Sequence, residues 1–332
     1  MKNTVLLLLI FIAISCGDEA QKPYQKFEGF AFGTSFHITF EGREGLITER
    51  SIDSIIHSVN KSLSTYIPNS DISKINRGDT TVIIDDLFQE VFEKSLIIYR
   101  ETDGFFDPTI GTMVNAWGFG PGERIQVMNQ TTIDSLMQYV GLEKVQILNG
   151  RLVKKYPETF LDFNANAKGY GVDRIGRYLE EKGISNYLVE IGGEIRARGV
   201  NSRDMTWRVA IEKPNFDGSR SFQTIVTLDN ESIATSGNYR KFKVDSISGE
   251  KYAHTINSKT GYPTKSNLLS ASVIGKIDCA DVDAYATSFM AMGYEKTRAF
   301  LDNHTDLKVF LIYSDTNGSL KTFTTSNLIL DE

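Results

Sequence analysis

Residues 187–228 read YLVEIGGEIRARGVNSRDMTWRVAIEKPNFDGSRSFQTIVTL, and this stretch decides the fold class. It contains strand-like runs at 187–191, 207–211 and 223–228, each bounded by Gly, Asn, Asp or Ser residues. Parallel strands need a long crossover connection, usually a helix, and crossover helices do not alternate regularly with these runs. The stretch therefore favours antiparallel pairing.

The rest of the chain has the same mixed character. Two more strand-like runs lie at 268–274 and 307–313, and residues 30–40 carry Phe or Ile mostly at even positions, the period of a half-buried strand. Helices are expected at residues 47–63, 87–99, 165–182 and 279–292. No fixed-period repeat and no Pro/Gly-rich linker divides the chain after Phe27. We expect an α+β fold, a single domain of mainly antiparallel sheets flanked by helices.

Length and composition indicate an ordinary globular protein. The chain has 332 residues, of which 41% are hydrophobic and 23% charged, enough for a substantial buried core. Its formal net charge is −6, and no run is dense in Lys or Arg. A broad contact with a phosphate backbone needs such positive charge, so nucleic acid is excluded as an expected partner.

The N-terminus has the pattern of a secretory signal. Residues 5–14 form an uninterrupted apolar stretch after Met1-Lys2-Asn3. As a helix it would cover about 15 Å, about half of a bilayer core, which is too short for a membrane span. Residues 13–16, Ala-Ile-Ser-Cys, resemble the bacterial lipobox. We predict a signal peptide at 1–15 and a lipid on Cys16, with cleavage without lipid as the alternative.

A short polar segment containing Pro23 follows the cysteine and suits a tether. We therefore assign residues 16–26 to the lipidated N-terminus and tether, and residues 27–332 to one catalytic domain. Cys279 would then be the only other cysteine, without a partner in the chain for a disulfide. We expect it to be buried or close to a site.

Several common active-site patterns are absent. The sequence has no strand-linked G-x-G-x-x-G and no G-x-x-x-x-G-K-[ST], so a nucleotide would have to be held in another way. The four histidines are far apart in the sequence and lack metal-binding spacing, which argues against a zinc site built from histidines. The G-x-S-x-G pattern of Ser-His-Asp hydrolases is also missing.

Two polar residues stand in an otherwise apolar helical segment. Asp283 and Thr287 are four positions apart among Ala, Tyr, Phe and Met, so they share one face of the expected helix. A carboxylate and a hydroxyl turned inward are hard oxygen ligands of the kind that Mg²⁺ prefers. The alternative is a helix cap together with a satisfied core threonine.

Residues 161–171, LDFNANAKGYG, place an acid and a lysine at an expected strand-to-helix junction. Lys168 would meet a phosphate as a point charge near the helix start, where free N–H groups also favour anions. Asp162 would accept a hydrogen bond from a ring N–H. The alternative is an N-cap followed by a surface lysine.

A histidine and two glycine-rich segments complete the candidates. His254 lies in an alternating strand pattern and would be a base for a hydroxyl nucleophile at neutral pH, although a lone histidine is more often structural. Gly192-Gly193 ends a strand and permits close approach of backbone to a ligand. Residues 104–111 and 117–120 combine aromatic residues with glycines and suit a flat ring system, although aromatic residues are more often core.

Taken together, these segments resemble the FAD:protein FMN transferase family, also called the ApbE family. The order and spacing of the matching segments agree over nearly the whole chain after the signal. They are residues 32–34, 64–66, 70–76, 106–109, 114–120, 167–170, 192–193, 234–237, 254–257, 260–263 and 283–287. The resemblance implies an ApbE-like (T-fold-like) domain.

The resemblance also implies roles for individual residues. Magnesium would be held by the backbone carbonyl of Ala165, the carboxylate of Asp283 and the hydroxyl of Thr287, and His254 would be the base. The residues implied to contact FAD are Phe32, Tyr66, Phe105, Phe106, Asp107, Asp162, Lys168 and Ile256. Two positions depart from the family pattern: Phe32 stands where Met is usual, and Asn166 stands where an apolar residue is common.

The implied activity is cleavage of FAD, release of AMP and attachment of FMN through a phosphoester bond to a Thr or Ser of a target protein. The implied targets are exported flavin-accepting subunits of membrane redox complexes, and the implied location is the periplasmic side of the inner membrane, through the lipid. Two alternatives remain: a magnesium-dependent FAD pyrophosphatase, in which water replaces the acceptor, and a non-catalytic FAD-binding lipoprotein.

Overall fold

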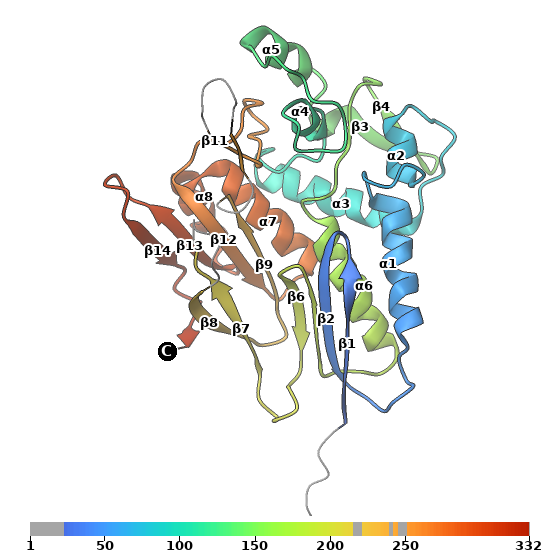
Figure 1. Ribbon diagram of the computed structural model, residues 1–332, viewed down its shortest axis with the longest axis vertical. Helices are drawn as coiled ribbons and strands as arrows, with labels where there is room; N and C mark the ends of the chain where they lie inside the picture. Colours follow the sequence, from blue (N-terminus) through green and yellow to red (C-terminus); the bar gives the residue numbers. More distant parts are fainter. Residues whose placement is uncertain (1–22, 215–220, 239–241, 245–250, 332) are drawn as a thin grey trace, which may run out of the picture.

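The computed structural model describes residues 23–214, 221–238, 242–244 and 251–331, and its centre is an eight-stranded sheet. Every neighbouring pair in this sheet is antiparallel (Figure 1), which confirms the predicted fold class. In sheet order the strands are β1 (Tyr24–Ala31), β2 (Thr34–Glu41), β5 (Tyr187–Ile191), β6 (Glu194–Arg198), β9 (Ser232–Gly237), β12 (Leu268–Gly275), β13 (Lys308–Ser314) and β14 (Leu320–Thr324).

Smaller sheets surround the main one. The order β15-β8-β7 forms a three-stranded sheet, while β3 pairs with β4 and β10 pairs with β11. Their bounds are β3 (Val145–Leu148), β4 (Arg151–Lys154), β7 (Trp207–Glu212), β8 (Phe222–Leu228), β10 (Phe242–Val244), β11 (Lys251–Ala253) and β15 (Leu330–Asp331). These pairs are antiparallel as well, and among the described residues only an isolated bridge between Ile110 and Phe160 is parallel.

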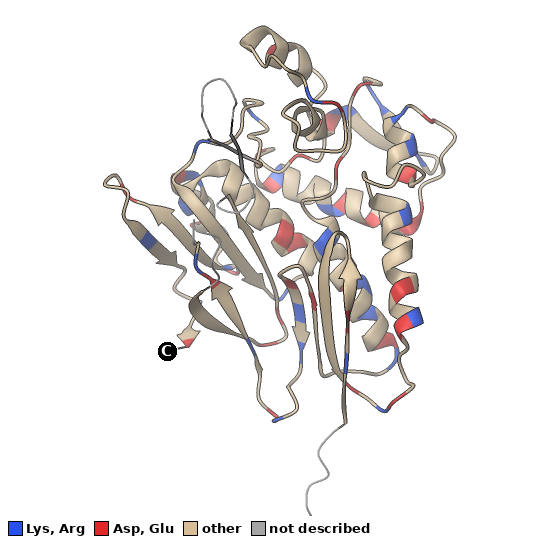
Figure 2. Cartoon of the chain, viewed as in Figure 1, with Lys and Arg blue, Asp and Glu red and all other residues tan. Residues whose placement is uncertain are grey.

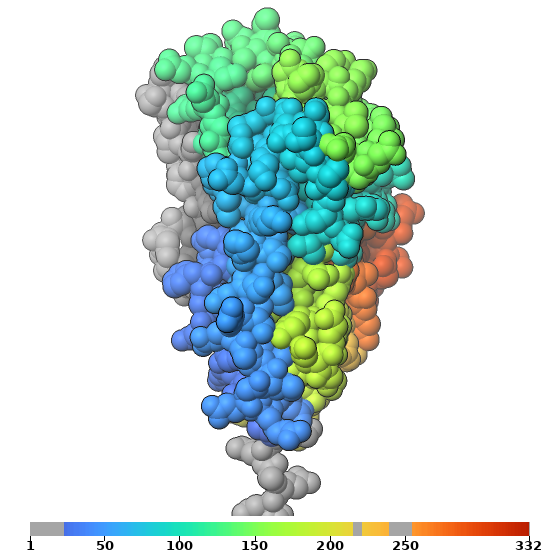
Figure 3. Space-filling model, turned by 90° about the vertical axis from the view of Figure 1, so that its right-hand side faces the viewer, coloured from blue at the N-terminus to red at the C-terminus, as the bar shows by residue number. Residues whose placement is uncertain are grey.

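Four long helices share a hydrophobic core with the main sheet. They are α1 (Glu49–Leu63), α3 (Asp86–Glu101), α6 (Ala167–Glu181) and α7 (Cys279–Met292). Seen from the side, α1 and α6 lie next to each other (Figure 3), and α6 also packs against α7. The shorter helices are α2 (Asp71–Asn76), α4 (Gly111–Ala116), α5 (Gln130–Met137), η1 (Leu142–Lys144) and α8 (Tyr294–Leu301).

Helix starts follow local capping. Thr48 accepts a hydrogen bond from the Ser51 backbone N–H, and Asp85 accepts one from the Phe88 N–H, so α1 and α3 begin directly after these residues. All four predicted helices are present within two residues of the expected bounds, and α7 has the bounds predicted for it. The amphipathic pattern located these elements because each buries one continuous face.

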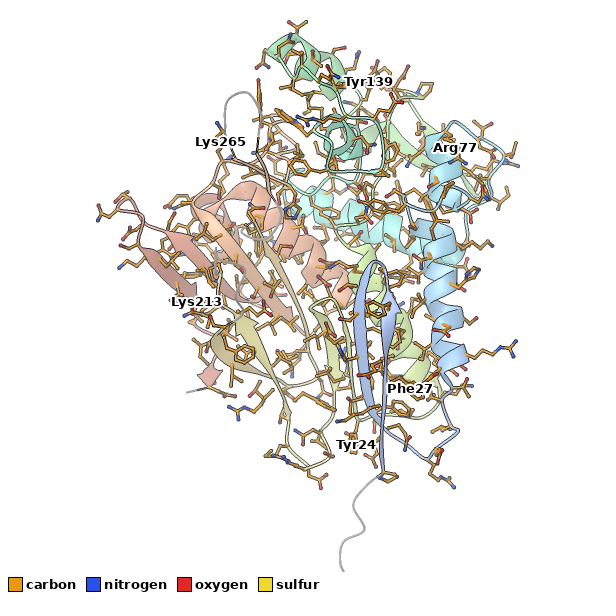
Figure 4. All side chains as sticks on the ribbon, viewed as in Figure 1. Tyr24, Phe27, Arg77, Tyr139, Lys213 and Lys265 are labelled. Atoms are coloured by element: carbon orange, nitrogen blue, oxygen red, sulfur yellow. The ribbon has the colours of Figure 1, made fainter. Side chains whose placement is uncertain are left out.

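One expected strand is two strands. Residues 30–40 form the end of β1, a two-residue turn at Phe32-Gly33 and most of β2. Both turn residues have positive φ, 52° and 80°, the backbone that a tight hairpin requires. The alternation continued through the turn and concealed it. Strand β1 begins at Tyr24, so the last three residues that were assigned to the tether pair with β2 instead. Tyr24 lies toward one end of the long axis of the molecule, and Tyr139 lies toward the other end (Figure 4).

The predicted signal peptide and Cys16 lie outside the described residues. Within the described ranges, no helix is both long and apolar enough to cross a membrane. Cys279 is buried at the start of α7, which agrees with the expectation for it.

Candidate active site

The candidate site lies where two tight turns of the main sheet meet the beginnings of α6 and α7. The Phe32-Gly33 turn joins β1 to β2, and the Gly192-Gly193 turn joins β5 to β6. Both glycines of the second turn have positive φ, 64° and 105°, and a Cβ on Gly192 would lie 2.6 Å from Thr34 Cγ2. The two turns therefore pack side by side at one edge of strands β2 and β5, which are hydrogen-bonded neighbours.

Helices α6 and α7 touch through their backbones at Gly169. A Cβ at this position would lie 2.4 Å from the Cys279 carbonyl oxygen, closer than real Cβ atoms approach. The Gly169 N–H donates a hydrogen bond to Asp283 Oδ2 at 3.2 Å. Because residue 169 has no side chain, the start of α6 comes directly against the first turns of α7.

Asn166 is the N-cap of α6, so the Gly169 N–H belongs to the first turn, where N–H groups have no acceptor within the helix, and Asp283 supplies one. The Ala165 carbonyl precedes the helix. In the part of the chain that the structure describes, no hydrogen-bond donor reaches the Ala165 oxygen. Ala165 is partly buried, and a carbonyl oxygen without a hydrogen-bond partner is a suitable ligand for a hard cation.

Thr287 adds a hydroxyl one helical turn beyond Asp283. Its Oγ1 lies 3.2 Å from Ser236 Oγ, near the end of β9. Among the described residues there is no cluster of three or more His, Cys, Asp or Glu side chains suited to a metal ion. The donors here are of a mixed kind: a backbone carbonyl, a carboxylate and a hydroxyl. All three are hard oxygen atoms, and they fit Mg²⁺.

The charges around these donors are unbalanced. Lys168 Nζ lies 2.6 Å from Glu194 Oε2, and the Glu194 side chain is 4% exposed. Burial raises the pKa of Asp283 well above its ordinary value and the nearby Glu194 raises it further, while Lys168 opposes the shift. When both acids are ionised, two buried carboxylates share one ammonium group, and the surplus negative charge favours a bound cation.

Tyr66 and Asp162 lie close to each other, in the segments after α1 and before α6. Tyr66, in the loop after α1, is 61% exposed, and its pKa is raised by partial burial and by the charge of Asp162. Burial raises the pKa of Asp162 to about 6, although its carboxylate accepts a hydrogen bond from the Asn164 N–H at 2.9 Å. Phe32, in the turn between β1 and β2, packs against Gly171 of α6.

The residues of the 105–107 segment differ in their surroundings. Phe106 is buried in the main core, and Asp107 accepts hydrogen bonds from the Thr109 N–H and hydroxyl, at 2.8 and 2.6 Å. Burial raises the pKa of Asp107 to about 6. The ring of Phe105 is partly exposed, with Lys296 Nζ 4.6 Å from its centroid. Phe105 alone of the three therefore presents its side chain beside cationic groups.

His254 follows β11 and is tied to the strand that contacts Thr287. The adjacent Thr255 hydroxyl donates to Asn238 Oδ1 at 2.9 Å, and Asn238 directly follows β9, which carries Ser236. His254 is partly buried. Ile256 is 5% exposed in a separate core cluster with Met113, Ile133 and Val140. The packing of Ile256 in this cluster holds the segment that follows His254 in place.

A cavity of about 490 Å³ lies beyond the other end of α7. Its wall includes Trp117, Tyr262 and Met292, and Asn257, which directly follows Ile256. None of the donors around Asp283 lines this cavity. It therefore adjoins the His254 segment and not the cation site.

Sequence reasoning missed Glu194 and an ionic network next to it. The Gly-Gly pair was noted, but no role was given to the acid that follows it, which is buried in β6. The signal that could have found it is a charged residue at an inward-facing position of a strand. Asp173, Arg196 and Asp278 also meet near the start of α7, from three different elements. Acidic and basic positions gather where α6, α7 and β6 meet (Figure 2).

Residues 32–311 match the sequence profile of the ApbE family. The chain belongs to the ApbE family. It is 34% identical over 306 residues to the FAD:protein FMN transferase of Haemophilus influenzae, covering 87% of this chain and 86% of the relative. It is 33% identical over 327 residues to the protein of that name from Vibrio cholerae, covering 96% of both chains. The predicted family is confirmed.

Solved structures of the ApbE family have the same fold. The flavin transferase ApbE from Vibrio cholerae superposes with a TM-score of 0.80 at 32% identity, covering 92% of this chain and 97% of that one. The flavinyl transferase ApbE from Pseudomonas stutzeri, in its apo form, gives 0.81 at 29% identity, covering 93% and 96%. The α+β assignment is confirmed by these structures as well.

Proposed function

We propose that this chain is a magnesium-dependent FAD:protein FMN transferase. It cleaves the pyrophosphate of FAD, releases AMP and attaches FMN to a Thr or Ser hydroxyl of a target protein. The observation that carries the proposal is the buried carboxylate of Asp283, which accepts one hydrogen bond, from the Gly169 N–H, and lies near the Lys168–Glu194 ion pair. The names of the relatives at 33% and 34% identity support the choice of reaction.

The chain's own oxygen atoms would hold the cation. The donors are the carbonyl of Ala165, the carboxylate of Asp283 and the hydroxyl of Thr287. When bound, Mg²⁺ supplies charge neutralisation and polarisation at the phosphoryl oxygens. Lys168 adds a second positive charge for the pyrophosphate, whose negative oxygens otherwise repel a nucleophile. Tyr66 and Asp162 would contact the flavin half from the exposed side, with Phe32, Phe105–Asp107 and Ile256 as further contacts.

His254 would accept the proton of the acceptor hydroxyl. As that oxygen bonds to the phosphorus of the FMN half, the bond from the phosphorus to the bridging oxygen breaks, and AMP leaves with that oxygen. The proton remains on the imidazole until solvent or the leaving phosphate takes it. No oxidant or reductant is needed, because the flavin keeps its oxidation state throughout.

A second candidate is FAD pyrophosphatase activity, in which water replaces the acceptor hydroxyl. The 61% exposure of Tyr66 favours it, because a site open on that side admits water. The products separate the two reactions: transfer adds an FMN mass to the acceptor, while hydrolysis releases free FMN.

The experiment is to incubate the chain from Gly17 onward with FAD, Mg²⁺ and a Thr-containing acceptor peptide, and to measure AMP and peptide mass. A gain of one FMN with a matching amount of AMP is expected. AMP without the mass gain would replace transfer by hydrolysis. FAD binding with neither product would favour a non-catalytic FAD-binding lipoprotein.

Replacing His254 tests the base. In His254→Ala, FAD binding should remain and transfer should fall by about 100-fold or more, in the range of general-base contributions. The matched control is His57→Ala, since His57 is exposed on α1 and should have no effect. A His254→Ala protein that flavinylates at the normal rate would remove the base from the mechanism.

We also propose that the protein is exported and anchored by a lipid on Cys16, facing the periplasm from the inner membrane. The apolar segment 5–14 and the cysteine after it support this proposal. Exported flavin-accepting subunits of membrane redox complexes would then be its acceptors. Fractionation of cells tests the anchor: a Cys16→Ala protein should leave the membrane fraction, and retention there would contradict it.

A further inference from the structure

Glu194 is a buried acid placed directly at the candidate site. It is the first residue of β6, immediately after the Gly192-Gly193 turn, and the residue is 3% exposed. Burying a carboxylate is costly unless a partner compensates its charge. Its cationic partner is the ammonium group of Lys168, 2.6 Å from Oε2.

The turn itself does not depend on Glu194. Its support comes from Glu190 on β5, whose Oε1 accepts a hydrogen bond from the Gly193 N–H at 2.7 Å and whose Oε2 lies 2.7 Å from His37 Nδ1. The side chain of Glu190 is only 20% exposed, yet it stands on the His37 side, apart from Lys168. The same hairpin therefore has one acid for the turn and another for the lysine.

Lys168 needs such a partner because its side chain is flexible. It stands in the first turn of α6, one residue before the Gly169 N–H that bonds Asp283, and its side chain is 32% exposed. An unpaired lysine samples many rotamers, and a point charge helps a reaction only when it is already in place. The ion pair with the buried Glu194 would hold the ammonium group, and the 32% exposure of the lysine side chain would leave it accessible to a phosphate.

We propose that Glu194 is a positioning residue for the reaction, which holds the Lys168 ammonium group where it meets the pyrophosphate of FAD. It acts through Lys168 and is not a ligand of the cation. This inference rests on the proposed function, because it assigns the phosphate contact to Lys168. It makes the strand-turn segment Gly192-Gly193-Glu194 part of the site through its acid as well as through its glycines.

A double-mutant cycle tests the inference. The proteins are Glu194→Gln, Lys168→Ala and the double variant, with Glu181→Gln, at the exposed end of α6, as the matched control. We measure kcat and KM for AMP release at saturating Mg²⁺, and FAD affinity by flavin fluorescence without Mg²⁺. Glu194→Gln should lower kcat/KM about 10- to 100-fold, within the range for residues that orient a functional group. Glu181→Gln should change it less than about twofold.

The decisive result is non-additivity. If Glu194 acts through Lys168, the double variant should be no slower than Lys168→Ala, and Glu194→Gln should weaken FAD binding in the same direction as Lys168→Ala. Effects that multiply in the double variant would overturn the inference. So would a Glu194→Gln protein whose loss is restored by tenfold more Mg²⁺, because that behaviour belongs to a metal ligand.

Two further arms keep the outcome interpretable. If Glu194→Gln fails to fold, Glu194→Asp retains the charge but shortens the reach by one methylene, and it should lose less activity than Lys168→Ala; an equal loss would contradict the proposal. If the wild type hydrolyses FAD without transfer, the transferase proposal fails while the cycle still applies to AMP release. If it releases no AMP, the binding arm still decides for or against Glu194.

Discussion

The two ends of the α6–α7 contact treat their buried acids in opposite ways. At one end, Asp173 accepts hydrogen bonds from the Cys279 and Ala280 N–H groups, at 2.9 and 2.8 Å, and lies 3.0 Å from Arg196 Nη1. Asp278 next to it forms ion pairs with three cations: Arg196, Arg177 and Lys94. At the other end, Asp283 has one backbone hydrogen bond, from Gly169, and no ion pair among the described residues.

This difference distinguishes carboxylates that hold the helices together from a carboxylate that still lacks a cationic partner. Carboxylates that are fully paired hold α7 against α6 and β6, and they leave nothing for a ligand to complete. A carboxylate that is buried with a single hydrogen bond is unfavourable in isolation and becomes favourable when a cation arrives. Acids at the same interface are therefore compensated by the chain's own cations at one end, while the acid at the other end is suited to a bound cation.

Asp283→Asn should produce the largest effect. Magnesium-dependent AMP release should fall on the order of 1000-fold, because a neutral amide is a poor ligand for Mg²⁺. The free energy of unfolding should stay equal or rise, since the change removes a buried charge beside Glu194. AMP release and urea unfolding of the same preparations provide the two measurements. Near-normal AMP release would show that the cation site has been assigned to the wrong residues.

Asp173→Asn should have the reverse profile. Removing one partner of a buried ion pair typically costs about 3 to 5 kcal/mol, so the midpoint of urea unfolding should drop clearly below that of the wild type. Below its unfolding temperature, the folded variant should keep AMP release within about tenfold, because the donors around Asp283 are unchanged. A protein of wild-type stability would contradict the division between the two ends.

Acid should weaken the paired end by a smaller amount. Burial alone would raise the pKa of Asp278, but Lys94, Arg177 and Arg196 outweigh it and lower the pKa to about 2, from an ordinary value of 3.8. A depressed pKa adds stability above the unfolded-state value and loses it as pH falls. Between pH 5 and pH 3 the loss from this group is about 1 kcal/mol. Urea unfolding at both pH values should show this loss in the wild type but not in Asp278→Asn.

Local patterns predicted the parts of the fold that depend on short-range order. The bounds of β5 and α7 follow from the sequence because each segment buries a regular face. The hairpin at Phe32-Gly33 was missed because its alternation of large and small residues does not stop at the turn. The antiparallel order of the main sheet joins strands that are far apart in sequence, and only its general mode was predictable.

The site shows the same limit. Asp283 and Thr287 were paired by helical spacing, and Ala165 entered only through the family resemblance, because a backbone carbonyl leaves no mark in a sequence. Glu194 was missed because its partner Lys168 stands on another element. The ion pair of Arg196 with Asp278 spans 82 positions. Such contacts depend on tertiary packing, which local periodicity does not describe.

The contact at Gly169 has a consequence in genetic terms. Every missense change in that codon adds a Cβ, and a Cβ there meets the Cys279 carbonyl oxygen at 2.4 Å. At core positions, one apolar residue can often replace another of similar volume without loss of the fold. At residue 169 no substitution is tolerated in this way. The close approach of α6 to α7, on which the hydrogen bond from Gly169 to Asp283 depends, is therefore encoded as the absence of a side chain.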